Sequence, residues 1–560
     1  MKIAIAVAAL ISSSIVVDKL ICPLPYRPKS LILIGLCLAY FVAKLLYFAW
    51  IYPYCVSPVR HLPAPSQKPH WLLGHFKCLS NNPDLSILQD WVEEHGEDTP
   101  FIRAFALFNS ERVIPVSEQA LQEVLQTKSY SFIKPPFLTR SLVSVLGNGI
   151  LFAEGDVHRH QRKLLMPAFK TSHVNRLVPI FLEESSRLQK LLEAKINGGD
   201  GIAKHQAEVE VTSLISSLTL DIIYRAGMGV TFNALEDPEN ELAVACQRVF
   251  NPGEHGTGLF FVLQVMIPWF KYLPFPKNRD IWRARLTIAK FARDIAEGRL
   301  AKFMAANGRD MDRELEGSFV GQKKDANILS VMLDEGDGQW TVDGIVDQLR
   351  TFLIAGHETT SVSTALALYL LAKHQDIQTR LRRELRTKFV GGYDTIKSYD
   401  DVESLKYLHN VVQEVLRFYP PVPETHRVPL EDIYICGQLI PKGTVIQIIT
   451  PVANKGRRFW GEDARQFNPD RWDETQGHRA MSFLTFLQGP RSCIGKRFAT
   501  FEMKCLLIAL VGNFKFELKD GYQVQFRNRI TFGIAGRLPL KVTHLEDWRR
   551  VDGDETDLKE

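Results

Sequence analysis

Ten residues near the C-terminus constrain this chain more than any other segment. From Phe486 to Gly495 the sequence reads FLQGPRSCIG, and Cys493 stands directly before a helix-forming run over residues 494–511. A thiol that binds a metal must lose its proton, and the N–H groups and dipole at a helix N-terminus favour the resulting anion. The loop therefore predicts a metal-bound Cys493 thiolate. The alternative is a buried structural cysteine beside a helix start.

Four neighbours of Cys493 fit a flat macrocycle that carries the metal. Gly489 and Gly495 leave room for the ring beside the backbone, because glycine has no side chain. Arg491 is a cation suited to carboxylates such as haem propionates. Phe486 can shield the sulfur from water, which would otherwise weaken its electron donation. The loop thus indicates an iron haem with Cys493 as its axial ligand.

The spacing F-x-x-G-x-R-x-C-x-G resembles the haem loop of the cytochromes P-450, the haem-thiolate monooxygenases. The resemblance covers nearly the whole chain after residue 60 and is greatest to fungal members that modify secondary metabolites. It implies a mainly α fold with small β-sheets behind an N-terminal transmembrane anchor. It also implies heme b with a cysteine-ligated iron, and insertion of one atom of dioxygen into a substrate by hydroxylation or epoxidation.

A second motif lies in residues 341–373, which predict one long apolar helix with its first residue, a threonine, as the N-cap. The run AGHETT at 355–360 weakens this helix in its middle, and such a departure from helix propensity is typical of functional sites. Glu358 and Thr359 would form an acid–alcohol pair that relays protons to a distal oxygen. The resemblance implies the same role. His357 occupies the family's variable position and is expected to pack, while a buried helix with a satisfied carboxylate is the alternative.

A third pattern concerns the support of the site. Glu414 and Arg417 lie three residues apart on a predicted helix, which alone is a common surface pair. The motif FNPDRW follows at 467–472. In the family the E-x-x-R pair and the arginine of this later motif form a buried triad behind the haem. The resemblance therefore implies that Glu414, Arg417 and Arg471 are structural residues.

Cations are also needed for the two haem propionates. Besides Arg491, the resemblance implies Arg427, which follows the run PPVPETH, and Arg162, in a segment similar to the family's W-x-x-x-R helix. Here His158 stands where the family has tryptophan, and an imidazole can still hydrogen-bond a propionate. Solvated surface charges are the alternative for each arginine.

The amino terminus predicts a membrane anchor. Residues 31–51 are an apolar run of spanning length with aromatic residues at its end, and its one charge, Lys44, can reach the interface. A shorter run at 3–17 is a possible second span, a re-entrant piece or a signal-like segment. The predicted organisation is an anchor over 1–54, a proline-rich hinge over 55–75, a catalytic domain over 76–545 and a polar tail over 546–560.

Composition bears on partners and compartment. The chain has 68 Lys and Arg against 63 Asp and Glu, and a net charge of +5 gives no case for nucleic-acid binding. Its eight cysteines lack paired spacing, which favours a reducing compartment over a disulfide scaffold. Together with the anchor, this predicts a protein of the endoplasmic reticulum membrane whose catalytic domain faces the cytosol.

Electrons must come from another protein, because no flavin- or nicotinamide-binding glycine fingerprint is present. In membrane-bound relatives the donor is a flavoprotein reductase that uses NADPH. Basic residues on elements that flank the thiolate could attract such an acidic partner, or could simply be solvated helix faces. They are Arg159, Lys163, Lys496 and Arg497.

The substrate is predicted only by class. Segments that resemble the family's pocket-lining regions are apolar, and they cover residues 131–151, 259–275, 422–428 and 530–534. A lipophilic molecule follows, whether a terpenoid, polyketide, alkaloid, fatty-acyl compound or xenobiotic. Two rival functions remain, a haem-thiolate isomerase or dehydratase that does not use dioxygen, and a haem protein that senses or stores a small ligand.

Overall fold

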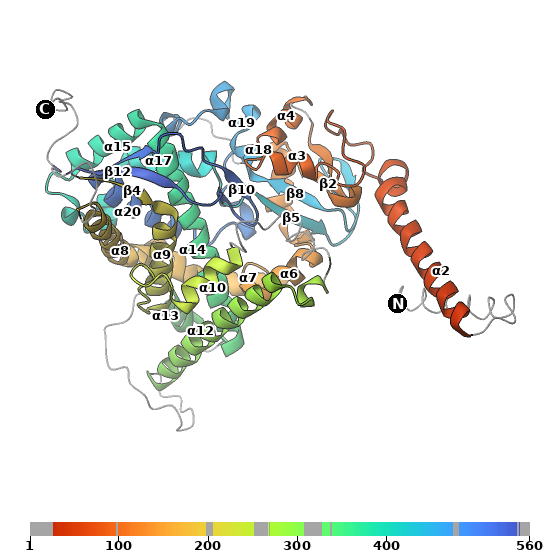
Figure 1. Cartoon of the computed structure of the whole chain (residues 1–560), viewed down its shortest axis with the longest axis horizontal. Helices are drawn as coiled ribbons and strands as arrows, with labels where there is room; N and C mark the ends of the chain where they lie inside the picture. Colours follow the sequence, from red (N-terminus) through yellow and green to blue (C-terminus); the bar gives the residue numbers. More distant parts are fainter. Residues whose placement is uncertain are drawn as a thin grey trace.

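One long helix, α14 (Val342–Lys373), runs through the middle of the protein (Figure 1). Thr341 caps its N-terminus, because the threonine hydroxyl accepts a hydrogen bond from the Gly344 N–H at 3.1 Å. Most of its side chains are buried on every face, which is typical of a helix enclosed by other elements. The predicted helix and its N-cap are both confirmed.

The computed structural model describes most of the chain, namely residues 26–96, 99–197, 205–250, 267, 269–306, 327–336, 339–473, 481–545 and 548. Three predicted segments lie wholly or largely outside these residues. They are the possible second span at 3–17, the pocket segment at 259–275 and the polar tail at 546–560.

Helices make up most of the described fold and surround α14. The longer ones are α6 (Pro136–Leu146), α7 (Gly155–Leu165), α8 (Thr171–Asn197), α9 (Val211–Ile222), α12 (Pro276–Ala306), α15 (Gln375–Lys388), α17 (Lys406–Phe418) and α20 (Lys496–Asn513). The shorter ones are α3 (Phe76–Asn81), α4 (Ile87–Glu93), α5 (Glu118–Gln122), α10 (Glu241–Phe250), α13 (Ile328–Gly336), α16 (Tyr399–Glu403), α18 (Thr450–Asn454) and α19 (Arg457–Trp460).

The described strands form four small sheets. The largest has the order β1-β2-β8-β5-β3, with β2 and β8 parallel and the other pairs antiparallel. Its strands are β1 (Phe101–Phe105), β2 (Glu111–Pro115), β8 (Ile446–Ile449), β5 (Glu424–Pro429) and β3 (Phe132–Ile133). The other sheets are β4 (Gln206–Glu210) with β12 (Pro539–His544) and β9 (Phe514–Leu518), the hairpin β10 (Phe526–Asn528) with β11 (Phe532–Ile534), and β6 (Ile433–Ile435) with β7 (Gln438–Ile440). The predicted class, mainly α with small β-sheets, is confirmed.

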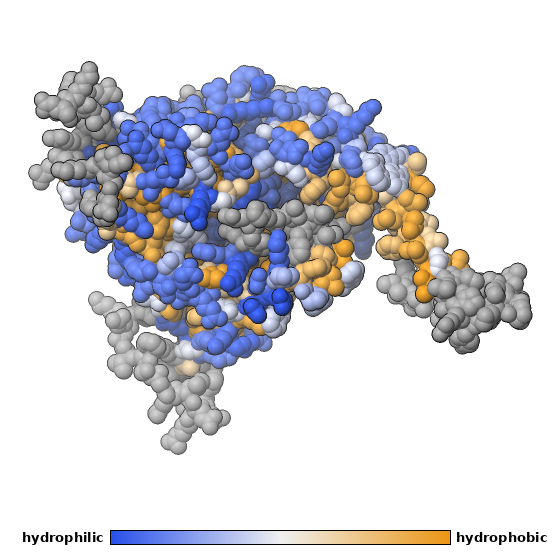
Figure 2. Space-filling view, in the orientation of Figure 1, coloured by the Kyte–Doolittle hydropathy of each residue, from blue (hydrophilic) through white to orange (hydrophobic). Residues whose placement is uncertain are grey.

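A single apolar helix projects from the body beside the five-stranded sheet. It consists of α2 (Tyr26–Leu46) and a π-helical continuation, η1 (Tyr47–Val56). By length and composition its segment Ile34–Val56, with a mean hydropathy of 1.9, could cross a membrane. Figure 2 shows this helix as an apolar rod outside the largely hydrophilic body. The helix continues to Val56, a few residues past the predicted span at 31–51.

The proline-rich segment that follows is bonded to the body. Val59 and Leu62 are buried, and the carbonyl of Pro63 accepts from the Arg103 N–H at 2.8 Å. The Arg103 side chain donates in turn to the carbonyls of Pro53 and Arg60. Residues 55–75 therefore join the apolar helix to the sheet as a packed connection and not as a free linker.

A buried ionic triad ties α17 to the segment before the cysteine loop. Glu414 and Arg417 are fully buried, with 2.8 Å between Arg417 Nε and Glu414 Oε2. Arg471 Nε lies 3.0 Å from the other carboxylate oxygen, and Trp472 also donates to this carboxylate. Arg417 further donates to the carbonyls of residues 454, 464 and 466. The predicted structural role of the triad is confirmed.

Replacing Arg417 with alanine should destabilise the fold strongly, because it leaves the Glu414 carboxylate buried beside carbonyls that have lost their donor. We expect the free energy of unfolding to fall by about 3–5 kcal/mol, as measured by chemical denaturation in detergent. Lys519→Ala is the control, because Lys519 and its partner Glu208 are about half exposed, and it should cost less than about 1 kcal/mol. Equal stability of the two variants would contradict the buried-triad assignment.

Candidate active site

The cysteine loop is fastened to the body by its backbone. The Cys493 N–H donates to the Phe486 carbonyl at 2.8 Å, and helix α20 begins three residues later at Lys496. Gly489 has a φ of +76°, and a Cβ built on it would lie 2.2 Å from the carbonyl oxygen of Leu125. The loop thus needs glycine here because it touches another backbone segment. Room for a macrocycle beside Gly489 stays a prediction.

The Cys493 thiol is accessible but closely surrounded by protein. Its side chain is exposed, yet burial by surrounding protein raises the pKa of the thiol. The Gly495 backbone N–H, Arg162 and Lys496 oppose this effect and lower the pKa. The helix N-terminus and nearby cations therefore only partly offset burial, and a bound metal cation is what makes the thiolate the stable form.

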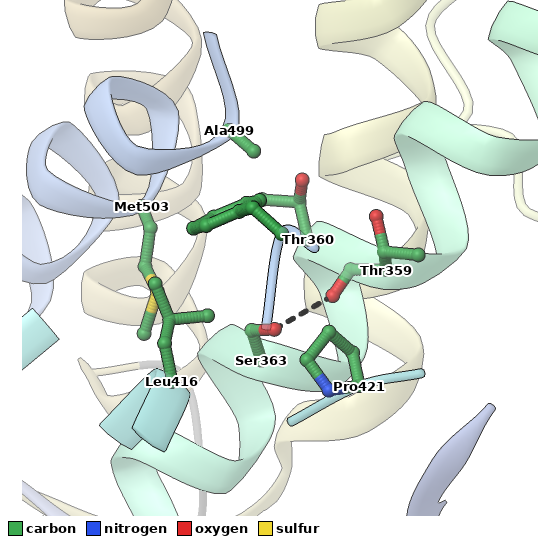
Figure 3. Close-up of a pocket in the computed structure, with 8 residues that line it drawn as sticks. Thr359, Thr360, Ser363, Leu416, Pro421, Ala499 and Met503 are labelled. Atoms are coloured by element: carbon green, nitrogen blue, oxygen red, sulfur yellow. Dashed lines mark hydrogen bonds between the residues drawn. The ribbon is translucent and has the colours of Figure 1, made fainter. Parts of the chain in front are cut away.

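Helix α14 forms the wall opposite the cysteine loop. A cavity shown in Figure 3 has Thr359, Thr360 and Ser363 of this helix along one side. Its other lining residues are Leu416, Pro421, Phe486, Ala499 and Met503. Two predicted site residues, Thr359 and Phe486, thus line the same cavity. The Thr359 hydroxyl donates to the Ala355 carbonyl at 2.8 Å, which keeps it beside the helix.

Glu358 points elsewhere. Its carboxylate accepts a hydrogen bond from the Thr531 hydroxyl at 3.1 Å and lies 3.6 Å from a nitrogen of Arg527. Burial raises the pKa of Glu358 to about 7, although Arg527 and Thr531 lower it. The acid and the alcohol of the predicted pair are therefore neighbours in sequence, but only Thr359 lines the cavity.

His357 packs as the sequence predicted. It is buried, and its Nε2 lies 3.0 Å from the hydroxyl of Ser216 in α9. Burial lowers the pKa of His357 to about 4, so the ring is neutral at physiological pH. The residue joins α14 to α9 and lies away from the cavity lining.

A buried group of cations lies at the edge of the site. Arg427 is 3% exposed, and burial together with Arg491 lowers its pKa to about 10. Lys134 is nearby, and burial, Arg427 and Arg491 lower its pKa to about 7. Glu154 pairs with Arg491 and lies 4.0 Å from the Lys134 amine. Sequence reasoning missed Lys134 and Glu154, because both stand outside any motif and only the fold brings them to the predicted arginines.

The two residues predicted from helix α7 lie on the same side of the site. Arg162 donates to the Ser492 carbonyl at 2.7 Å and to its hydroxyl at 3.2 Å, so its guanidinium holds the cysteine loop. His158 is buried, with Nδ1 3.1 Å from the Tyr130 hydroxyl. Burial and the surrounding cations lower the pKa of His158 to about 4. The imidazole is therefore a neutral hydrogen-bonding group and not a further cation.

These residues fit a haem. Cations outnumber the carboxylate that faces them within the described part of the chain, and the buried Nε of Arg491 has no acceptor there. Buried cations of this kind need anions, and haem propionates would supply two. The loop that carries the accessible Cys493 thiol contributes Phe486 to the same cavity as Thr359 of α14, and this thiol would ligate the iron. The fold and the site together define a haem-thiolate protein.

Comparison with known proteins agrees with this class. The family model described as Cytochrome P450 matches residues 63–538. The chain belongs to the cytochrome P450 family and is a haem-dependent monooxygenase. In this family a cysteine thiolate ligates the haem iron, and a reductase supplies electrons from NADPH.

Similar curated proteins come from several fungi. Cytochrome P450 monooxygenase sphH of Aspergillus fumigatus is 36% identical and covers 90% of this chain and 92% of its own length. Cytochrome P450 monooxygenase ALT8 of Alternaria alternata is 32% identical and covers 90% and 93%. Cytochrome P450 monooxygenase FUM15 of Gibberella moniliformis is also 32% identical and covers 90% and 91%.

Two glycine variants should show which glycine of the cysteine loop is needed for its packing. Gly489→Ala places a methyl group against the Leu125 carbonyl and strains a positive φ, so we expect a loss of at least about 1 kcal/mol in unfolding free energy. Gly495→Ala is the matched control, because its added Cβ would approach Phe169 at an ordinary 3.9 Å. Thermal melting of the two purified variants checks this. A normal melting temperature for Gly489→Ala would show that the loop does not need the contact.

Proposed function

We propose that this protein is a membrane-anchored monooxygenase that hydroxylates or epoxidises a lipophilic secondary metabolite of the terpenoid, polyketide or alkaloid class. The observation that carries the proposal is the accessible Cys493 thiol, which belongs to a loop whose Phe486 lines the same cavity as Thr359 of α14. Around the hydroxyl groups of α14 the cavity lining is apolar, with leucine, proline, phenylalanine, alanine and methionine side chains. Such a lining favours apolar substrate atoms over charged ones.

The proximal side of the haem follows from the cysteine loop. Cys493 would ligate the iron, and the bound haem would supply the oxygen-activating chemistry. Gly489 gives the loop its shape, while Phe486 keeps water from the sulfur. Lys496 stands over the Phe486 ring at 5.7 Å from its centre.

The buried cations at the edge of the site would hold the two propionates. Arg427 and Arg491 are buried cations, and we add Lys134 to them on the basis of its place beside both. His158 would donate one hydrogen bond as a neutral imidazole. Arg162 would have a different role, because its guanidinium is hydrogen-bonded to Ser492. It would hold the loop beside Cys493 in addition to facing a propionate.

Proton delivery would involve both residues predicted on α14. Thr359 lines the cavity, and its hydroxyl would hand a proton to the distal side. Glu358 titrates close to neutrality, with a pKa of about 7, and it can therefore both accept and release a proton under physiological conditions. The acid would feed the alcohol and not contact the reacting atoms itself.

The anchor and the electron donor complete the proposal. Helix α2 with η1 would hold the protein in the endoplasmic reticulum membrane, with the catalytic domain in the cytosol. An NADPH-dependent flavoprotein reductase would dock on the thiolate side, where four basic residues are exposed, namely Arg159, Lys163, Lys496 and Arg497. An isomerase or dehydratase on the same fold would work without this partner, so dependence of turnover on NADPH distinguishes the two.

Cys493→Ala should remove the thiolate ligand. The reduced, carbon-monoxide-bound protein should show the far red-shifted Soret band of thiolate-ligated haem, and the variant should lose it. Cys505→Ala is the matched control, because Cys505 is a buried cysteine on α20, the helix that follows Cys493, and its loss should leave the band in place. Retention of the band in Cys493→Ala would refute the ligand assignment.

Thr359→Ala should separate NADPH consumption from product formation. Without the hydroxyl, proton delivery to the distal side of the haem would no longer be controlled, and peroxide would be released in place of product. We therefore expect product formed per NADPH to drop at least about tenfold, measured with reductase and a lipophilic compound that changes the haem spin state. Thr364→Ala, one turn further along the buried helix, is the control. If Thr359→Ala stays coupled, water or another side chain delivers the proton.

A further inference from the structure

The Glu358 carboxylate is held by a hairpin that is distant in sequence. Thr531, in the turn between β10 and β11, is buried and donates to Glu358 Oε1 at 3.1 Å. Arg527 of β10 lies 3.6 Å from the same oxygen. The Arg527 side chain is 17% exposed and the Glu358 side chain 7%, so the pair connects the interior to the protein surface.

This hairpin is packed rigidly against α14. Phe526 and Phe532 stack at 5.4 Å across it, and Tyr419 lies 5.3 Å from each ring. The Phe532 N–H donates to the Pro421 carbonyl at 2.9 Å. A Cβ on Gly533 would come within 3.2 Å of Val362, so the strand lies directly on the helix. Arg527 and Thr531 therefore approach Glu358 from a fixed platform.

Opposing effects act on the carboxyl group. Burial raises the pKa of Glu358 to about 7, while the positive charge of Arg527 and the Thr531 hydrogen bond lower it. From α10, Cys246 also faces Glu358, and burial and this carboxylate raise the thiol's pKa to about 12. Cys246 thus stays a neutral thiol, and Arg527 is the charged group that acts on the Glu358 carboxylate.

We propose that Arg527 and Thr531 are positioning residues for proton delivery, which hold the Glu358 carboxyl on the hairpin side of α14 and set the pH at which it releases its proton. The carboxyl gives one proton toward the cavity, the carboxylate left behind is stabilised by the guanidinium, and a proton from surface water restores the acid. This inference rests on the proposed role of Glu358. It deepens that role by assigning the groups that control it.

The test is an infrared titration of the haem-loaded, full-length protein. The carbonyl band of protonated Glu358 is identified as the band that Glu358→Gln removes, and its intensity is followed against pH. In Arg527→Gln the charged carboxylate loses its cation, so the midpoint should move to higher pH by about one unit. Thr531→Val removes only the hydrogen bond, so it should move the midpoint in the same direction by less.

Two controls fix the interpretation. Arg527→Lys keeps the positive charge and should titrate near the parent protein, while Arg529→Gln changes the neighbouring arginine of the same hairpin and should leave the midpoint in place. An unchanged midpoint in both Arg527→Gln and Thr531→Val would overturn the inference. The carbon-monoxide spectrum of each variant reports the proposed thiolate haem separately, so a failed titration beside a normal spectrum refutes only the hairpin's role.

Discussion

Charge buried away from water is the constraint on which the rest of this structure depends. A charged group in the interior is tolerated only when another group compensates it. The Glu414 carboxylate is compensated within the protein by Arg417 and Arg471, so this triad needs no further ligand. The cations around Arg491 are only partly compensated by Glu154, so this part of the interior is complete when an anionic cofactor is bound.

Helix α14 separates two kinds of chemistry. One face presents the hydroxyl of Thr359 to the cavity, while the next residue back, Glu358, reaches the β10–β11 hairpin. Successive residues on a helix point about 100° apart, so adjacent residues serve different surroundings. In the proposed reaction the acid would equilibrate with the solvent side while the alcohol stays at the cavity. This division would let the timing of proton arrival decide the product.

Short-range patterns in the sequence were enough for the parts of the site that one segment builds. The N-cap of α14, the helix after Cys493 and the general fold class follow from local residue order and from the family resemblance. Parts assembled from distant segments were not predictable in this way. Lys134 and Glu154 carry no motif, and the direction of Glu358 depends on where Thr531 packs.

The glycines show the same limit. Their presence in the motifs was visible, but the distant segments that pack against them were not. Gly489 is required by the Leu125 carbonyl, which lies more than 360 positions away in sequence. A Cβ on Gly356 would lie 3.0 Å from Ile223, so the missing side chain lets another helical segment approach α14. A single sequence identifies such positions without naming the neighbour that requires them.

The junction between anchor and body has a mechanical consequence. Trp50 stacks on Trp71 at 5.9 Å and Tyr54 on Phe105 at 5.4 Å, while Arg103 bonds the carbonyl of Pro53. These contacts fix the base of the helix formed by α2 and η1 to the sheet. If this helix spans a bilayer, the body would keep a fixed tilt relative to the membrane and a fixed distance from it. Every part of the body, the cysteine loop included, would then keep a constant orientation to the membrane plane.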